Sequence, residues 1–165
     1  MAWTSPAVFI AHAKLTAAQL NAVQDNLRAI GEPWTAYTPT WTTTGTAPSL
    51  GNGSLTGAYV KAGRLVVFRA VLTAGSSTTF GTGNWSLSLP SLAAATVGRQ
   101  PVPALGRDDS ATDDYGLAAV IASGASTCAL RVATSAPWPN VTASAPFTWA
   151  TGDSLTVCGT YEAAA

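Results

Sequence analysis

Near the start of the chain, apolar and polar residues recur with the period of a helix. Over residues 16–30 (TAAQLNAVQDNLRAI), large apolar side chains are spaced three, four and three residues apart, and the other large side chains are polar. This spacing places the apolar side chains along one narrow stripe of a helix about 22 Å long. The apolar stripe consists of Leu20, Val23, Leu27 and Ile30.

Capping signals stand at both ends of this pattern. Thr16 is a preferred N-cap residue, and Gln19 follows at the spacing of a capping box. Gly31 and Pro33 are stop signals after the last apolar position. The sequence therefore predicts one short helix. Residues 1–14, which precede it, have no periodicity, and we expect an arm that is ordered against a partner.

The apolar stripe has two possible partners. Leucine at both a positions of a heptad, Leu20 and Leu27, with β-branched residues at the d positions favours three or four helices over two. A helix this short is marginal in water by itself. Either copies of the same chain cover the stripe, in which case we predict a homotrimer, or the stripe docks on the chain's own β region.

From residue 34 onward the pattern changes to that of strands. Residues 64–73 (RLVVFRAVLT) are rich in β-branched and large apolar types, and residues 54–59 form a shorter extended run before them. A turn at 61–63 would make the two a hairpin. Because residues 65–68 are all apolar, we expect both faces of the longer strand to be covered, in the centre of a two-layer structure.

Further strand signals follow to the end of the chain. Residues 35–41 are extended, with Pro39 at a bend, and residues 85–89 alternate with period two. The other candidate strands are residues 102–105, 116–121, 127–133 and 154–161. The sequence predicts a mainly β chain: a helical segment at 1–33 and an antiparallel, jelly-roll-like β-sandwich head at 34–165.

Composition and charge restrict the partners. Of 165 residues only 10% are charged, and the net charge is zero, so neither nucleic acid nor an anionic membrane surface is indicated. No apolar run approaches the roughly 18–20 residues that span a bilayer. A weakly charged surface rich in small residues favours packing against copies of the chain or against a neighbouring protein.

Catalytic patterns are missing from the sequence. His12 is the only histidine, no GxSxG element is present, and the two glutamates, Glu32 and Glu162, stand near opposite ends. The glycine-rich segment at 51–57 (GNGSLTG) precedes a strand and lacks the Lys-Ser/Thr pair of a phosphate loop, so it predicts a turn. We predict no catalytic residue and no cofactor.

Two groups of residues raise the question of metal binding or of a disulfide. The segment at 107–114 (RDDSATDD) gathers Asp108, Asp109, Asp113 and Asp114. It lacks the spacing of a calcium loop, and we predict solvated loop charges with calcium as the alternative. Cys128 and Cys158 lie in apolar runs and are predicted to be buried free thiols, although a disulfide stays open.

The chain has six tryptophans. Their default role in the β region is packing in the core or at an interface. Trp138 stands in a proline-rich segment at 136–146 (APWPNVTASAP) and is the candidate for stacking against a sugar ring.

Several of these stretches together resemble a known group of proteins. They are W-T-x-P near the start, LTAAQLNxxxDNL at 15–27, WTAYTPTWT, GNGSLTGAYVKAGRLVVFRAVLTAGSSTTFGTGNWSLSLP, and FTWATGDSLTVCGTYEA at 147–163. The chain resembles minor tail or tail-fibre-like virion proteins of tailed bacteriophages and prophages of actinobacteria. The resemblance covers nearly the whole chain, and its central glycine-rich part is the most specific.

The resemblance implies a homotrimer with an N-terminal helical attachment segment and a distal β-sandwich head, and it supplies no catalytic residue. We expect a non-enzymatic structural protein on the virion surface that contacts other virion proteins through its N-terminal segment. A short receptor-binding knob for host-surface glycan and a capsid decoration protein both fit, and a glycan-cleaving enzyme is the remaining alternative.

Overall fold

A computed structural model describes residues 8, 10–11, 13–31, 33–133 and 137–164. Most of the predicted arm at 1–14 lies outside the described residues, as do His12 and Glu32. The side chain of Ile30 also lies outside them. Among the residues that are described, none of the helices combines the length and the apolar character needed to cross a bilayer.

Helix α1 (Ala17–Ile30) begins as the sequence predicts. The Gln19 backbone N–H donates to the Thr16 hydroxyl (3.3 Å), and the Thr16 backbone N–H donates to the Gln19 side-chain oxygen (2.9 Å), which is a complete capping box. At the other end the Gly31 N–H donates to the Arg28 carbonyl (2.9 Å), with a φ of −97° at Gly31. Gly31 therefore ends the helix without the left-handed conformation that makes glycine common there.

Within the described residues, nine strands follow the helix and form a single antiparallel sheet. Their bounds are β1 (Thr35–Tyr37), β2 (Trp41–Thr43), β3 (Ser54–Ala62), β4 (Leu65–Thr73), β5 (Trp85–Ser88), β6 (Gln100–Asp108), β7 (Asp113–Ile121), β8 (Thr127–Val132) and β9 (Ser154–Glu162). The strand order is β1-β3-β4-β9-β6-β7-β8-β5-β2. The prediction of a mainly β chain with one short N-terminal helix is confirmed.

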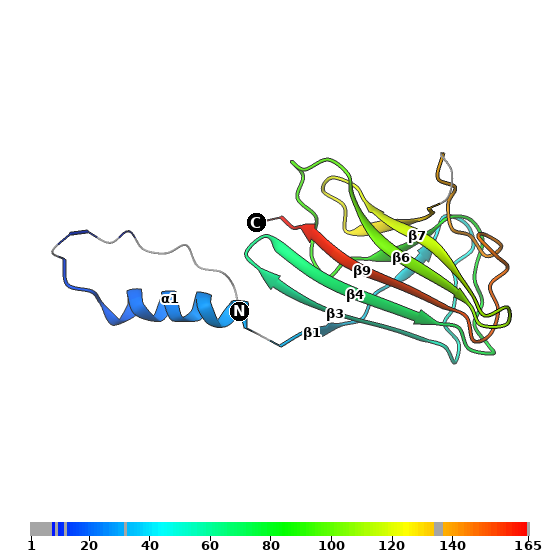
Figure 1. Ribbon diagram of the computed structural model, residues 1–165, viewed down its shortest axis with the longest axis horizontal. Coiled ribbons are helices and arrows are strands. Elements are labelled where there is room, and N and C mark those ends of the chain that lie inside the picture. Colours follow the sequence, from blue (N-terminus) through cyan, green and yellow to red (C-terminus); the bar gives the residue numbers. More distant parts are fainter. Residues whose placement is uncertain (1–7, 9, 12, 32, 134–136, 165) are drawn as a thin grey trace.

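The sheet is strongly curled (Figure 1). Strands β1 and β2 are its two edges, yet only residues 38–40 connect them. A connection of this length spans at most about 14 Å, whereas the edges of a flat sheet of this size would lie roughly 38 Å apart. The sheet therefore curves into a half-barrel until its two edges approach each other.

The sheet comes close to dividing between β9 and β6. These strands pair only from Ala104 to Arg107 on the β6 side. Pro101 and Pro103 have no backbone N–H to donate, so they cannot extend the ladder. Beyond these prolines the Gln100 side chain takes the place of the missing backbone hydrogen bonds to β9. Its oxygen accepts from the Glu162 N–H (2.6 Å), and its amide donates to the Glu162 carbonyl (3.2 Å). The predicted jelly-roll-like sandwich of two sheets stays a prediction.

The core fills the concave side of the curled sheet. Strand β4 alternates regularly, with Val66, Phe68, Ala70 and Leu72 buried and the residues between them half-buried or exposed. The expectation that both faces of this strand are covered is therefore wrong for a single chain. Within the apolar run at 65–68, the outward residues are Leu65, which is exposed, and Val67, which is half-buried, so the run does not show that a second layer covers the outer face.

Three tryptophans form the centre of the core. The Trp85 ring lies 4.6 Å from Trp41 and 4.9 Å from Trp149, measured between ring centroids, and all three residues are buried. Such offset aromatic contacts add to the stability given by buried area. The predicted packing role is confirmed for these residues, whereas Trp34 and Trp138 are exposed.

Candidate functional site

Helix α1 leads away from one end of the β domain (Figure 1) and contacts it at strand β3. Two residues of the apolar stripe stand in solvent, since Leu20 is 53% exposed and Leu27 is 64% exposed. Val23 is half-buried and the neighbouring Asn26 is buried. One side of the helix is thus covered within the chain, while its leucine side is open. The sheet of the same chain does not cover these leucines.

The segment after α1 returns to the convex face of the sheet. Trp34 lies over the guanidinium of Arg69, with 5.4 Å between the Arg69 Cζ and the ring centroid. Arg69 is an outward residue of β4. This cation–π contact fixes the start of the β domain against its own convex side.

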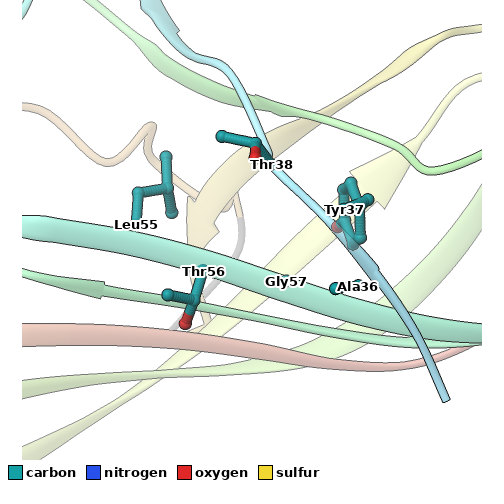
Figure 2. A pocket seen from close by; sticks show the side chains of 6 residues that line it. All are labelled: Ala36, Tyr37, Thr38, Leu55, Thr56 and Gly57. Carbon is teal, nitrogen blue, oxygen red and sulfur yellow. The ribbon is translucent and has the colours of Figure 1, made fainter.

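A shallow hollow of about 260 Å³ lies between β1 and the uncovered part of β3 (Figure 2). It is lined by Ala36, Tyr37, Thr38, Leu55, Thr56 and Gly57. Two neighbouring hollows measure about 330 Å³, beside Arg69 and Val71, and about 280 Å³, beside Trp41 and Pro48. The three hollows contain no carboxylate, histidine or thiol, so their residues supply contact surface and no acid–base pair.

Tyr37 stands beside Gly57 at the edge of this hollow (Figure 2). A Cβ added at Gly57 would overlap the Tyr37 ring, so only glycine lets the ring lie flat on β3. Burial raises the pKa of the Tyr37 phenol well above its ordinary value, which keeps the side chain neutral. Tyr37 therefore acts as a packing residue that holds β1 on β3.

We expect Gly57→Ala to lower the free energy of unfolding by about 1–2 kcal/mol, because the new methyl group displaces the Tyr37 ring. Urea denaturation followed by tryptophan fluorescence measures the change. Gly116→Ala on β7 is the matched control, since its Cβ would meet no atom within 4 Å. Equal stability of the two variants would contradict the role given to Gly57.

Trp138 is 43% exposed in the connection between β8 and β9. Hydrogen bonds hold this connection to β8, because the Val132 N–H donates to the Pro139 carbonyl (2.8 Å) and the Val141 N–H donates to the Leu130 carbonyl (3.1 Å). The indole is therefore presented to solvent from an anchored segment, as a stacking platform requires.

The acidic segment at 107–114 comprises the end of β6, a turn at 109–112 and the start of β7. The Asp108 carboxylate accepts from the Ala111 N–H (3.0 Å) and the Ser110 hydroxyl (2.8 Å), and these bonds lower its pKa. Asp114 pairs with Arg107 at 3.3 Å. Within the described residues, no three His, Cys, Asp or Glu side chains gather as metal ligands would. Turn formation accounts for Asp108, and an ion pair with Arg107 accounts for Asp114.

Asp153 is a polar core residue that the sequence pattern does not reveal. Its side chain is 1% exposed, and its two oxygens accept from the Asp109 N–H (2.9 Å) and the Ala150 N–H (2.7 Å). It ties the β6–β7 turn to the turn before β9. The segment TGDS signals only a turn, and the distant partner is 44 residues away, so sequence spacing gives no sign of the contact.

Both cysteines are free, but only one of them is buried. Burial raises the pKa of the Cys128 thiol to about 11. Cys158 is exposed, which corrects the prediction for this residue. The physical reason is strand alternation, because the neighbouring Val157 points into the core and Cys158 points outward.

No protein-family model matches the chain, and neither a curated protein nor a solved structure does. The exposed leucine side of α1 and the open convex face of the sheet are thus the features from which a function can be inferred.

Proposed function

We propose that this chain is a non-enzymatic structural protein of a tailed-bacteriophage virion, forming a homotrimeric surface knob or a minor tail or tail-fibre component. Residues 1–33 attach to the particle and bring three chains together, and residues 34–165 are the head. The observation that carries the proposal is the pair of exposed leucines, Leu20 and Leu27, on a helix that leads away from its own β domain.

The apolar stripe supports self-association. Leu20 and Leu27 occupy a positions, and the d positions hold Val23 and Ile30, a combination that favours three or four helices. A helix of 14 residues is marginal in water, so burying its two open leucines would stabilise it further. Other copies of the chain carry the matching stripe in the same register.

The head has the composition of a protein that contacts other surfaces without chemistry. The three hollows described above hold no acid–base pair, and the Asp108 carboxylate is bonded within its own turn. The finer proposal for its architecture is a jelly-roll-like sandwich, supported by the short pairing between β6 and β9 at which the sheet nearly divides. A glycan-cleaving enzyme would have to release sugar from host cell walls, and we expect none.

Two experiments test this proposal. Light scattering of the purified protein should give three times the chain mass of 16.7 kDa, and a stable monomer at micromolar concentration would refute the trimer. Labelling intact particles with an antibody against the head should place the protein on the virion. Label at the tail supports the knob, label over the capsid supports decoration, and absence from the particle removes the virion proposal.

Host-glycan binding is the second function, and the exposed Trp138 on its anchored loop favours it. Trp138→Ala should weaken binding of the trimer to host cells by roughly 10–100-fold, the usual cost of removing a central aromatic anchor. Leu92→Ala is the control, because Leu92 is an exposed apolar residue that lies outside the proposed contact surfaces. If the unmodified protein binds no host cells, capsid decoration is favoured.

A further inference from the structure

We infer that the β domains of neighbouring copies contact each other through the convex side of strands β4, β9 and β6, named here the outer face. The inference rests on the proposed trimer and identifies a second contact surface beyond the helix. The outward residues that define the outer face are Val67, Val71, Thr156, Cys158, Thr160 and Leu105.

The register of the sheet places these side chains in cross-strand rows. Val71 pairs with Thr156, and Thr156 pairs in turn with Leu105, so one row crosses three strands. Val67 pairs with Thr160 in a second row. Leu105 is 43% exposed, and Leu65, at the end of β4 nearest α1, is 53% exposed. The rows combine valine and leucine with threonine, and the two leucines leave apolar surface open that a second copy would cover.

Charged groups lie mainly at the ends of the outer face and are paired there. Arg64 binds Glu162 at 2.7 Å at the end near α1, and Arg107 binds Asp114 at 3.3 Å at the other end. Arg69 lies in the middle, and its guanidinium is stacked under Trp34. A second copy would therefore bury few unpaired charges, which is the main cost of covering a sheet face.

The helix is too small to hold three chains together by itself. Association costs translational and rotational freedom, and stable interfaces bury about 800 Å² on each partner. The open parts of Leu20 and Leu27, with the rest of the stripe on a helix of 14 residues, cover only part of such an area. A trimer that persists at micromolar concentration needs additional contact area from the β domains.

The outer face is placed to supply that area. Strands β3, β4 and β9 run along the same long direction of the molecule as α1 (Figure 1), so helices that meet side by side bring these strands alongside one another. Trp34, just after the helix, already lies on this side of the sheet through its contact with Arg69. Contact between copies at the helix would therefore bring their outer faces within reach of one another.

The face also has the asymmetry that a closed ring requires. In a threefold ring each copy presents one patch to a different patch of the next. Leu105 protrudes from β6, and the hollow of about 330 Å³ beside Arg69 and Val71 recedes between β3 and β4. A protruding apolar side chain on one edge and a hollow on the other suit such a head-to-tail contact.

Cys158 offers a test that needs no substitution in the outer face, because it is an exposed native thiol there while Cys128 is buried. The full-length chain would be reacted with a bulky maleimide as trimer and as the monomeric variant Leu20→Asp/Leu27→Asp. We expect Cys158 to react at least tenfold more slowly in the trimer, with Cys128 unreactive in both. Equal rates in trimer and monomer would overturn the outer-face contact and leave the trimer standing.

A variant supplies the second readout. Leu105→Glu with Thr160→Glu adds two carboxylates to the outer face at exposed positions. The concentration at which trimers dissociate, followed by sedimentation velocity, should rise by at least tenfold. Thr42→Glu, exposed on β2 far from β9 in strand order, is the control and should leave it unchanged. An unchanged midpoint for the double variant, with a normal melting temperature, would overturn the inference. A monomeric unmodified chain would overturn the proposed trimer as well.

Discussion

Replacing Leu20 and Leu27 together by aspartate is expected to convert the proposed trimer into a monomer of 16.7 kDa. Both leucines are more than half exposed in the single chain, so the change costs the isolated fold little. In the proposed trimer this change would bury several carboxylates between the apolar stripes of the three helices, where like charges repel and lose hydration. We expect the association free energy to weaken by more than about 4 kcal/mol, a factor of roughly 1,000 in concentration.

Light scattering and sedimentation at several concentrations measure this effect. The matched control is Asn21→Asp with Gln24→Asp, which adds the same two charges at exposed polar positions of α1. The control should keep the mass of the unmodified protein. If the leucine variant also keeps that mass while circular dichroism shows the helix intact, the apolar stripe is not the interface.

The second large effect is expected at Asp153. Asp153→Ala removes a buried carboxylate and leaves the N–H groups of Asp109 and Ala150 without their acceptor. Hydrogen bonds to charged groups contribute about 1.5–3 kcal/mol each, so the free energy of unfolding should fall by about 3–4 kcal/mol. For a domain of this size the melting temperature should drop by roughly 10 °C.

Two further variants identify the groups on which this loss of stability depends: Asp153→Asn and Asp109→Ala. Asparagine keeps one acceptor oxygen, so it should lose about half as much stability as alanine. Asp109→Ala removes an exposed side chain but retains the backbone N–H that Asp153 binds, and it should change the melting temperature by no more than about 2 °C. A loss at Asp109 as large as that at Asp153 would show that the carboxylate of Asp109, and not the buried one, holds the turn.

Local structure followed from local sequence. The capping box at Thr16 and Gln19 formed because both partners lie within one turn of helix. The β3–β4 hairpin turned near Gly63, where a φ of 59° suits glycine. In each case the interacting residues are neighbours in sequence, so propensity and spacing contain the needed information.

The errors in strand length have a common cause. Strand β6 was expected at 102–105 and runs from Gln100 to Asp108. Prolines usually exclude a residue from an inner strand, but Pro101 and Pro103 lie where β9 no longer pairs with β6. Strand β7 was predicted to begin at residue 116 but begins at Asp113. Aspartate is typical of turns, so the sequence alone does not place Asp113 and Asp114 in a strand.

The arrangement of the sheet and the candidate surfaces needed three-dimensional structure. The spacing of apolar residues does not show that β1 and β2, which are neighbours in sequence, become opposite edges of the sheet. The apolar run at 65–68 is compatible with a covered strand or with an open outer face. The exposure of Leu105 and Cys158 likewise depends on which face of a strand meets the core, and a shift of one residue would reverse it.

The connection at 38–40 has a mechanical consequence for a head held by its helix. Tension applied at α1 passes the Trp34–Arg69 contact and then reaches β1, which is only three residues long and by itself would peel off the sheet. The chain continues directly into Trp41, which is buried in the core on the opposite rim. A pulling force is therefore shared between both edges of the half-barrel, and the β domain should resist shear better than a domain tethered by a single edge.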